Sequence, residues 1–167
     1  MSKPKQSQSL APAVLALTAL DQGIKIWITS RCPGAGVTLI SQRLRFQPMI
    51  NRDLSWAGQF IPWLREKRTA IGLNAAALAV IWNKWRQTCR RSRGNPSRFS
   101  RAGAALALSA GLCSLLDKSL WGGSLDYLQL PGKCTFDLKD VYLFSSLPAL
   151  FPQFLRPRGE KKRRPKG

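Results

Sequence analysis

The sequence predicts an all-α membrane protein with four transmembrane helices and a small extracytoplasmic element, made of strands and an amphipathic helix, between spans one and two. Two observations lead to this fold class. Apolar residues, an ordinary 44% of the 167 residues, are gathered in blocks, and the Lys and Arg residues cluster between and after those blocks. In a basic soluble domain, charged residues alternate with apolar ones at helical or strand period. The length suits a single domain.

We expect the spans at about residues 10–29, 66–84, 102–121 and 139–156. The first supplies the roughly 20 residues that a membrane helix needs, whereas the other apolar runs are short enough to be core helices. Asp21 and Lys25 are four residues apart in the first span, so they share a helix face and can pair. A signal peptide and a soluble buried helix are the alternatives for this segment, although it has no clean small-x-small cleavage site.

The charge distribution gives an orientation. Net charge is +19, which by itself suggests a nucleic acid or an anionic membrane surface as partner. With the N-terminus inside, the segments 1–9, 83–101 and 156–167 hold sixteen Lys and Arg residues, against nine in the outside segments. This bias follows the positive-inside rule. We therefore expect a basic cytoplasmic loop at 83–101 and a basic cytoplasmic tail at 156–167 that attracts anionic lipid head groups.

The segment between the first two spans has two parts. Apolar residues alternate with polar ones in 37–46 after a Pro33–Gly34 turn signal, which predicts one or two strands. Residues 50–64 follow with Trp56, Phe60 and Trp63 at helical spacing. This pattern is typical of an amphipathic helix at a membrane interface, but an ordinary core stripe has the same pattern.

Residue types limit the chemistry. The chain has no histidine, which excludes imidazole acid–base catalysis and a Ser–His or Cys–His triad. Its four cysteines have no CxxC spacing, so we expect no metal site and no cofactor.

Aspartates remain as candidates. Four of the eight acidic residues lie in 110–144, and two of them, Asp126 and Asp140, flank a short loop between spans three and four. Two carboxylates brought together in a low-dielectric setting cannot both ionise easily, so one becomes an acid and the other a base. This is how aspartic proteases activate water and polarise a peptide carbonyl.

Five segments resemble, in order, the sequence boxes of the signal peptidase II family, a family of four-span intramembrane aspartic endopeptidases. They are Asp21-Gln22-Gly23-Ile24-Lys25 (similar to DQxxK), Asn51-Arg52-Asp53-Leu54-Ser55-Trp56 (N-x-G-x-[SA]-[FW]), Cys113-Ser114-Leu115-Leu116-Asp117-Lys118 (GNxxDR), Gly123-Ser124-Leu125-Asp126-Tyr127 (G-x-V-x-D-F) and Phe136-Asp137-Leu138-Lys139-Asp140 (FNxAD).

The resemblance implies the roles of individual residues. It makes Asp126 and Asp140 the catalytic pair of an enzyme that cleaves signal peptides from lipid-modified prolipoproteins. It implies a multi-pass protein of the bacterial plasma (inner) membrane with both termini cytoplasmic, and we expect a monomer. The supporting or substrate-binding positions that it implies are Asp21, Lys25, Asn51, Ser114, Asp117, Lys118 and Asp137.

The chain departs from the family pattern at several positions. Cys113-Ser114 stands where Gly-Asn is usual, and Lys118 replaces an arginine, which loses a bidentate fork. Asp137 replaces an amide, and Lys139 replaces a small residue beside Asp140. Either the site is an active variant in which Asp137 and Lys139 compensate each other, or the protein has lost activity.

Three hypotheses follow. The first is the active endopeptidase. The second is a catalytically impaired membrane homologue that still binds lipoprotein precursors. The third is a soluble basic nucleic-acid-binding protein, which high salt would extract without detergent; we disfavour it because the charge lies in loops and tail beside apolar blocks.

Overall fold

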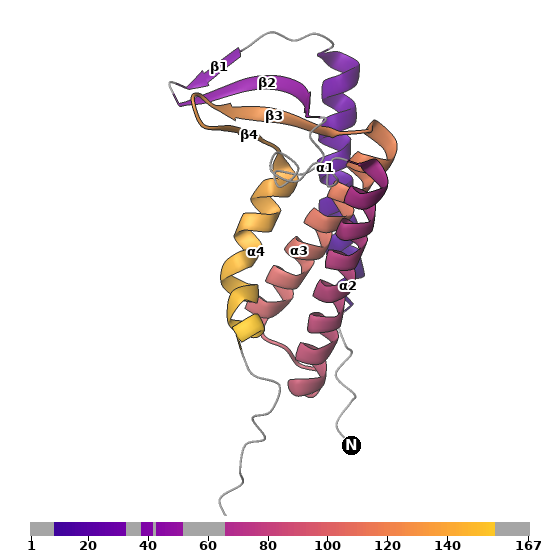
Figure 1. Cartoon of the computed structure of the whole chain (residues 1–167). Coiled ribbons are helices and arrows are strands. Elements are labelled where there is room, and N and C mark those ends of the chain that lie inside the picture. Colours follow the sequence, from indigo (N-terminus) through magenta and orange to yellow (C-terminus); the bar gives the residue numbers. More distant parts are fainter. Residues whose placement is uncertain (1–8, 33–37, 42, 52–65, 156–167) are drawn as a thin grey trace, which may run out of the picture.

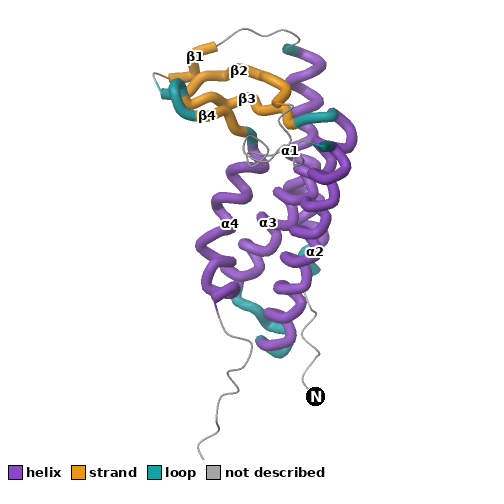
Figure 2. The backbone as a smooth tube through the Cα atoms, viewed as in Figure 1, coloured by secondary structure: helices purple, strands orange, loops and turns teal. Residues whose placement is uncertain are grey.

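In the described part of the chain, long helices run side by side, and a small sheet lies across one end of the bundle (Figure 1). The computed structural model describes residues 9–32, 38–41, 43–51 and 66–155. Within these residues, the strands are gathered at one end of the molecule, beside the end of the first helix (Figure 2). The helices are α1 (Ala11–Arg31), α2 (Lys67–Arg91), α3 (Arg98–Leu116), which continues into the short π-helix η3 (Asp117–Trp121), and α4 (Leu138–Leu155). The antiparallel sheet has the order β1 (Thr38–Ser41), β2 (Leu44–Asn51), β3 (Ser124–Leu130) and β4 (Cys134–Phe136).

Helix α3 packs against α1, α2 and α4 through a face of small residues. Ala104, Ala105, Ala107 and Ala110 are all buried on it. At Gly103 the approach is closest, because a Cβ atom there would overlap the Cβ of Ala149 in α4. Small residues let helix backbones approach closely, which is how helices associate in lipid.

The sheet buries one set of alternating side chains against α1. Leu125 and Tyr127 in β3 form a core cluster with Ile28 near the end of α1. Successive side chains of a strand point to opposite faces, so Ser124 and Asp126 share the other face. Asn51 in β2 pairs with Ser124, which brings its side chain beside this second face.

The chain enters β3 through two glycines. Gly122 ends η3 in the left-handed conformation, with φ of 66°. A Cβ on Gly123 would lie 2.7 Å from the backbone oxygen of Asn51. Only glycine allows β3 to begin this close to the end of β2.

The predicted fold class is confirmed in its coarser form: the protein is mostly helical and has a small antiparallel sheet. Strands β1 and β2 confirm the strands expected between the first two spans. The segment between Asp126 and Asp140, which we expected to be a short loop, instead supplies the second half of β3 and all of β4. Because β3 and β2 are far apart in the chain, no local sequence pattern predicts the hydrogen bonds between them. The predicted amphipathic helix lies outside the described residues.

Among the residues that the structure describes, two helical segments are long and apolar enough to cross a membrane: α1, and α3 together with η3. The helices extend beyond the predicted spans: α2 continues to Arg91, and α3 begins at Arg98. Much of the basic segment 83–101 is therefore helical.

We expect Gly103→Ala to destabilise the protein by about 1–3 kcal/mol, because the added methyl group overpacks the contact with Ala149. Gly72→Ala in α2 is the matched control, since a Cβ there meets nothing within 4 Å in the described part of the chain. The control should be slightly stabilised, as alanine favours a helix over glycine. Unfolding midpoints in detergent micelles measure both, and equal midpoints would contradict the packing argument.

Candidate active site

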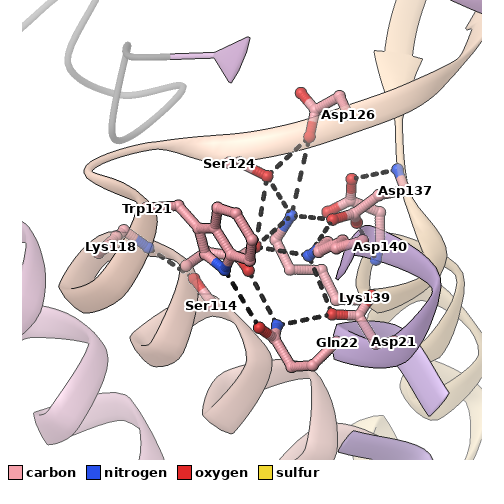
Figure 3. Close-up of polar contacts among 12 residues, drawn as sticks. Asp21, Gln22, Ser114, Lys118, Trp121, Ser124, Asp126, Asp137, Lys139 and Asp140 are labelled. Carbon is pink, nitrogen blue, oxygen red and sulfur yellow. Dashed lines mark hydrogen bonds and ion pairs between the residues drawn. The ribbon is translucent and has the colours of Figure 1, made fainter. Parts of the chain in front are cut away.

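A buried cluster of charged side chains lies where the bundle meets the sheet (Figure 3). Its members come from α1, η3, β3 and the start of α4, and they combine five aspartates with two lysines. At most 8% of each of six members is exposed: Asp21, Lys25, Asp117, Asp126, Asp137 and Lys139. Asp140 is half-buried. Buried charges are rarely found unpaired, so each needs a partner within the cluster.

Lys25 holds three elements together. Its Nζ lies 2.9 Å from Asp21 one turn earlier in α1, 2.7 Å from Asp117 in η3 and 2.7 Å from Asp137 before α4. The pairing of Asp21 and Lys25 that the sequence predicted is confirmed, and two further carboxylates join it. Because the Lys25 side chain has no exposed surface, these carboxylates replace all of its water.

Gln22 and Trp121 extend this network. The Gln22 amide donates to Asp21 and Asp117 at 3.1 and 3.0 Å, and its oxygen accepts from the Trp121 indole at 3.3 Å. Gln22 therefore fixes the orientation of two of the carboxylates that surround Lys25.

Asp137 and Asp140 cap the start of α4. The Asp137 carboxylate accepts from the backbone N–H of Asp140, and the Asp140 carboxylate accepts from the backbone N–H of Asp137, both at 3.2 Å. This reciprocal arrangement is a capping box, in which each side chain satisfies an otherwise unpaired helix N–H. The cap leaves the second oxygen of Asp137 free to contact Lys25 and Lys139.

The register of the sheet positions Asp126. Asn51 and Ser124 are paired across β2 and β3, and Asp126 lies two residues further along the same face. Asn51 donates to one oxygen of Asp126 at 3.3 Å, and the Ser124 hydroxyl donates to the other at 2.7 Å. Lys139 lies 3.8 Å from the carboxylate oxygen that Ser124 contacts.

The carboxylates of Asp126, Asp137 and Asp140 converge. One oxygen from each lies within 4.8 Å of the other two. Three carboxylates at this spacing could hold a metal ion, but the ammonium of Lys139 already contacts Asp137 at 2.5 Å. A lysine therefore supplies the positive charge that a cation would bring.

Burial and nearby positive charge act in opposite directions on the pKa values of Asp126 and Asp137, the two aspartates of the cluster that lie outside the helices. Burial raises the pKa of Asp126 above its ordinary value, although the Ser124 hydrogen bond and Lys139 offset part of this. Burial would also raise the pKa of Asp137, but the charges of Lys139 and Lys25 outweigh it and lower that pKa. Asp137 is therefore a stable carboxylate, whereas Asp126 is closer to accepting a proton.

The structure brings together seven of the nine residues predicted for the site: Asp21, Lys25, Asn51, Asp117, Asp126, Asp137 and Asp140. Ser114 and Lys118 form a separate pair, with the ammonium 2.5 Å from the hydroxyl. Among the described residues, neither of them forms an ion pair with the cluster.

Four residues that contact the cluster were not among the site residues predicted from the sequence: Gln22, Trp121, Ser124 and Lys139. Ser124 had a usable signal, because it stands two residues before Asp126 and so shares its face of a strand. Lys139 had one as well, as an unusual charge next to Asp140. The partnership of Trp121 with Gln22 spans 99 residues of chain and has no local signal.

These features define a class: a mostly helical protein with helices long and apolar enough to cross a membrane, and with converging carboxylates at one end of its bundle. A family model described as signal peptidase (SPase) II matches residues 13–156, nearly the whole chain. The chain therefore belongs to the signal peptidase II family, which is a family of membrane peptidases. The resemblance seen in the sequence is thereby confirmed.

Two solved structures have a similar fold. Both are titled as bacterial membrane enzyme structures obtained by the in meso method, one at 2.3 Å and the other at 1.9 Å resolution. The first has a TM-score of 0.73 and 14% identity, covering 100% of this chain and 99% of its own. The second has a TM-score of 0.72 and 15% identity, covering 93% of this chain and 98% of its own. No curated protein matches the chain at a significant level.

Removal of the Lys25 charge tests the network. We expect Lys25→Met to destabilise the fold by about 3–5 kcal/mol, because Asp21, Asp117 and Asp137 lose a shared buried partner. Adding Asp137→Asn should recover part of this loss. Lys133→Met, at an exposed lysine between β3 and β4, is the matched control. Denaturant unfolding in micelles measures all three, and equal stability of Lys25→Met and Lys133→Met would refute the argument.

Proposed function

We propose that this chain is an aspartic endopeptidase of the membrane that removes signal peptides from lipid-modified prolipoproteins, with Asp126 and Asp140 as its catalytic pair. One observation carries the proposal: carboxylate oxygens of these two residues lie within 4.8 Å of each other, in a chain that belongs to the signal peptidase II family. A pair at this separation can share one proton and one water molecule.

The reaction needs one ionised and one protonated carboxyl group. The ionised group takes a proton from water as the water oxygen attacks the carbonyl carbon of the scissile bond. The protonated group donates to the carbonyl oxygen and stabilises the tetrahedral intermediate. When the intermediate collapses, the C–N bond breaks, the leaving amine takes up the proton that the first carboxylate took from water, and the second carboxylate takes back a proton from a hydroxyl of the intermediate.

The proposed topology places this chemistry at the outer surface of a bacterial plasma membrane. All four helices cross the membrane, with both termini cytoplasmic, so that the sheet end of the bundle faces outward. Large apolar side chains exposed on the helices support this, since they would otherwise face water; they include Leu15, Trp27, Phe144 and Phe151. The basic residues of 83–101 and 156–167 then face anionic lipid head groups. The chain acts as a monomer and binds no nucleic acid.

Lys139 favours a second candidate, the catalytically impaired homologue that binds precursors. Its ammonium lies 3.8 Å from Asp126 and contacts Asp137, so it neutralises carboxylates where the family pattern has a small residue. Complementation distinguishes the two candidates, because only the active enzyme restores cleavage.

In a bacterium that lacks its own lipoprotein signal peptidase, we expect the wild-type chain to restore cleavage of prolipoprotein, and Asp126→Asn and Asp140→Asn to abolish it. Removing one member of such a pair typically costs several orders of magnitude in rate. Glu66→Gln, at an exposed carboxylate before α2, is the matched control and should behave as wild type. Immunoblots for uncleaved precursor give the result. Normal processing by both Asn variants would contradict the proposed function.

The pH dependence of cleavage follows from Asp126. A pair that works through an ionised base loses activity as the pH falls through the base's pKa. Because burial raises the pKa of Asp126, the acid limb of kcat/KM should lie above the ordinary aspartate value of about 3.9. The measurement is kcat/KM against pH for a lipopeptide substrate in micelles. A limb at or below that value would contradict the assignment of Asp126 to the pair.

A further inference from the structure

Among the described residues, the Lys139 ammonium contacts three aspartates of the cluster described above, and it also contacts Ser124. Its Nζ is 2.5 Å from Ser124 Oγ, 2.5 Å from Asp137 Oδ2, 3.4 Å from Asp117 Oδ2 and 3.8 Å from Asp126 Oδ1. Only 8% of the residue is exposed. The proposed reaction does not require a lysine at this position, so its role needs a separate explanation.

Ser124 connects Lys139 to Asp126. A hydroxyl has one proton to donate, and the shorter of its acceptor distances is the 2.7 Å to Asp126 Oδ1. An ammonium only donates, so Lys139 donates to Ser124 Oγ and Ser124 in turn donates to Asp126. Hydrogen bonds in such a chain polarise one another, which strengthens the bond to the carboxylate.

The two members of the proposed pair have unequal surroundings. Asp126 accepts from Ser124 and Asn51 and forms an ion pair with Lys139. In the part of the chain that the structure describes, the Asp140 carboxylate accepts one hydrogen bond, from the backbone N–H of Asp137, and forms no ion pair, although the charge of Lys139 also acts on it at longer range. The negative charge of Asp137 lies beside it. Donors and a positive charge favour the ionised form, and a neighbouring negative charge disfavours it.

Other charged groups near Lys139 leave this difference between the surroundings of Asp126 and Asp140 in place. From α1, Lys25 repels Lys139 while Asp21 balances Lys25. From η3, Asp117 attracts it, and Lys118, which bonds to Ser114, repels it. From α4, Asp140 attracts it. Asp137 Oδ2 contacts both ammoniums, Lys25 at 2.7 Å and Lys139 at 2.5 Å, which is how two lysines can lie this close.

We propose that Lys139, acting through Ser124, is a positioning residue that keeps Asp126 ionised and leaves the shared proton of the pair on Asp140. The inference rests on the proposed function, in which the two carboxylates act together on water and the scissile carbonyl. Asp126 is then the base that takes a proton from water, and Asp140 is the acid that donates to the carbonyl oxygen.

The first test is the pH profile of cleavage by the full chain in micelles. Lys139→Met should move the acid limb of kcat/KM upward by about one to three pH units, the effect expected of an opposite charge at this distance. Ser124→Ala should move it in the same direction by less, and Lys139→Arg should keep it near the wild-type position. In the double variant with Lys139→Met and Asp137→Asn, the acid limb should return toward its wild-type position, because a negative charge is removed together with the positive one. Lys133→Met is the matched control.

The second test needs no activity. Infrared spectra of the wild-type chain at neutral pH should contain the carbonyl stretch of one protonated carboxyl group. The frequency of this band depends on the hydrogen bonds of that group. Ser124 contacts Asp126, so Ser124→Ala should leave the frequency unchanged if the proton is on Asp140. In Lys139→Met the band should persist to higher pH.

The outcomes separate the two proposals. If wild type fails to cleave but the infrared results are as expected, the proposed function is wrong and the role of Lys139 stands. If wild type cleaves but Ser124→Ala shifts the band, the proton is on Asp126 and the role of Lys139 is wrong. The proposed role of Lys139 is also wrong if the acid limb of kcat/KM stays in place in both Lys139→Met and Ser124→Ala. If Lys139→Met does not fold, Ser124→Ala and Lys139→Arg still test the role of Lys139, because these two substitutions preserve most of the packing.

Discussion

The buried ammonium of Lys25 is the constraint on which the rest of the site depends. It removes a full charge from water, which costs several kcal/mol unless carboxylates take the place of the solvent. Those carboxylates come from α1, from η3 and from the residue before α4, so the ion pairs draw three distant segments together. The start of α4 is thereby held against the bundle, and the capping box transmits that position to Asp140.

Asp126 is positioned by a different device. The register between β2 and β3 sets Asn51 and Ser124 beside it, and Gly122 and Gly123 allow the chain to turn from η3 directly into that register. The two halves of the proposed pair are thus carried by separate supports, a helix cap and a sheet. Electrostatic preorganisation requires such rigid support, because a carboxylate that moved would lose its alignment with the other.

Asp137 and Lys139, the two departures from the family pattern beside Asp140, act together in the structure. Each would be costly alone, as an extra charge in a buried cluster. Together they form an ion pair at 2.5 Å, and Asp137 also satisfies the helix cap as an asparagine side chain could. Lys139 in turn reaches the Asp126 side of the cluster through Ser124. A substitution pattern that suggests decay in the sequence is therefore an organised arrangement in three dimensions.

The sequence by itself determined what depends on short spacings: apolar runs predicted the helical segments, alternation predicted β1 and β2, and a spacing of four predicted the Asp21–Lys25 pair. The family boxes also implied Asp126 and Asp140 as a catalytic pair, which stays a prediction. Only the tertiary structure decided the pairing of β3 with β2, the separate bond between Ser114 and Lys118, and the bridge from Lys139 through Ser124. These depend on helix rotation and strand register, which are set by contacts between segments far apart in the chain.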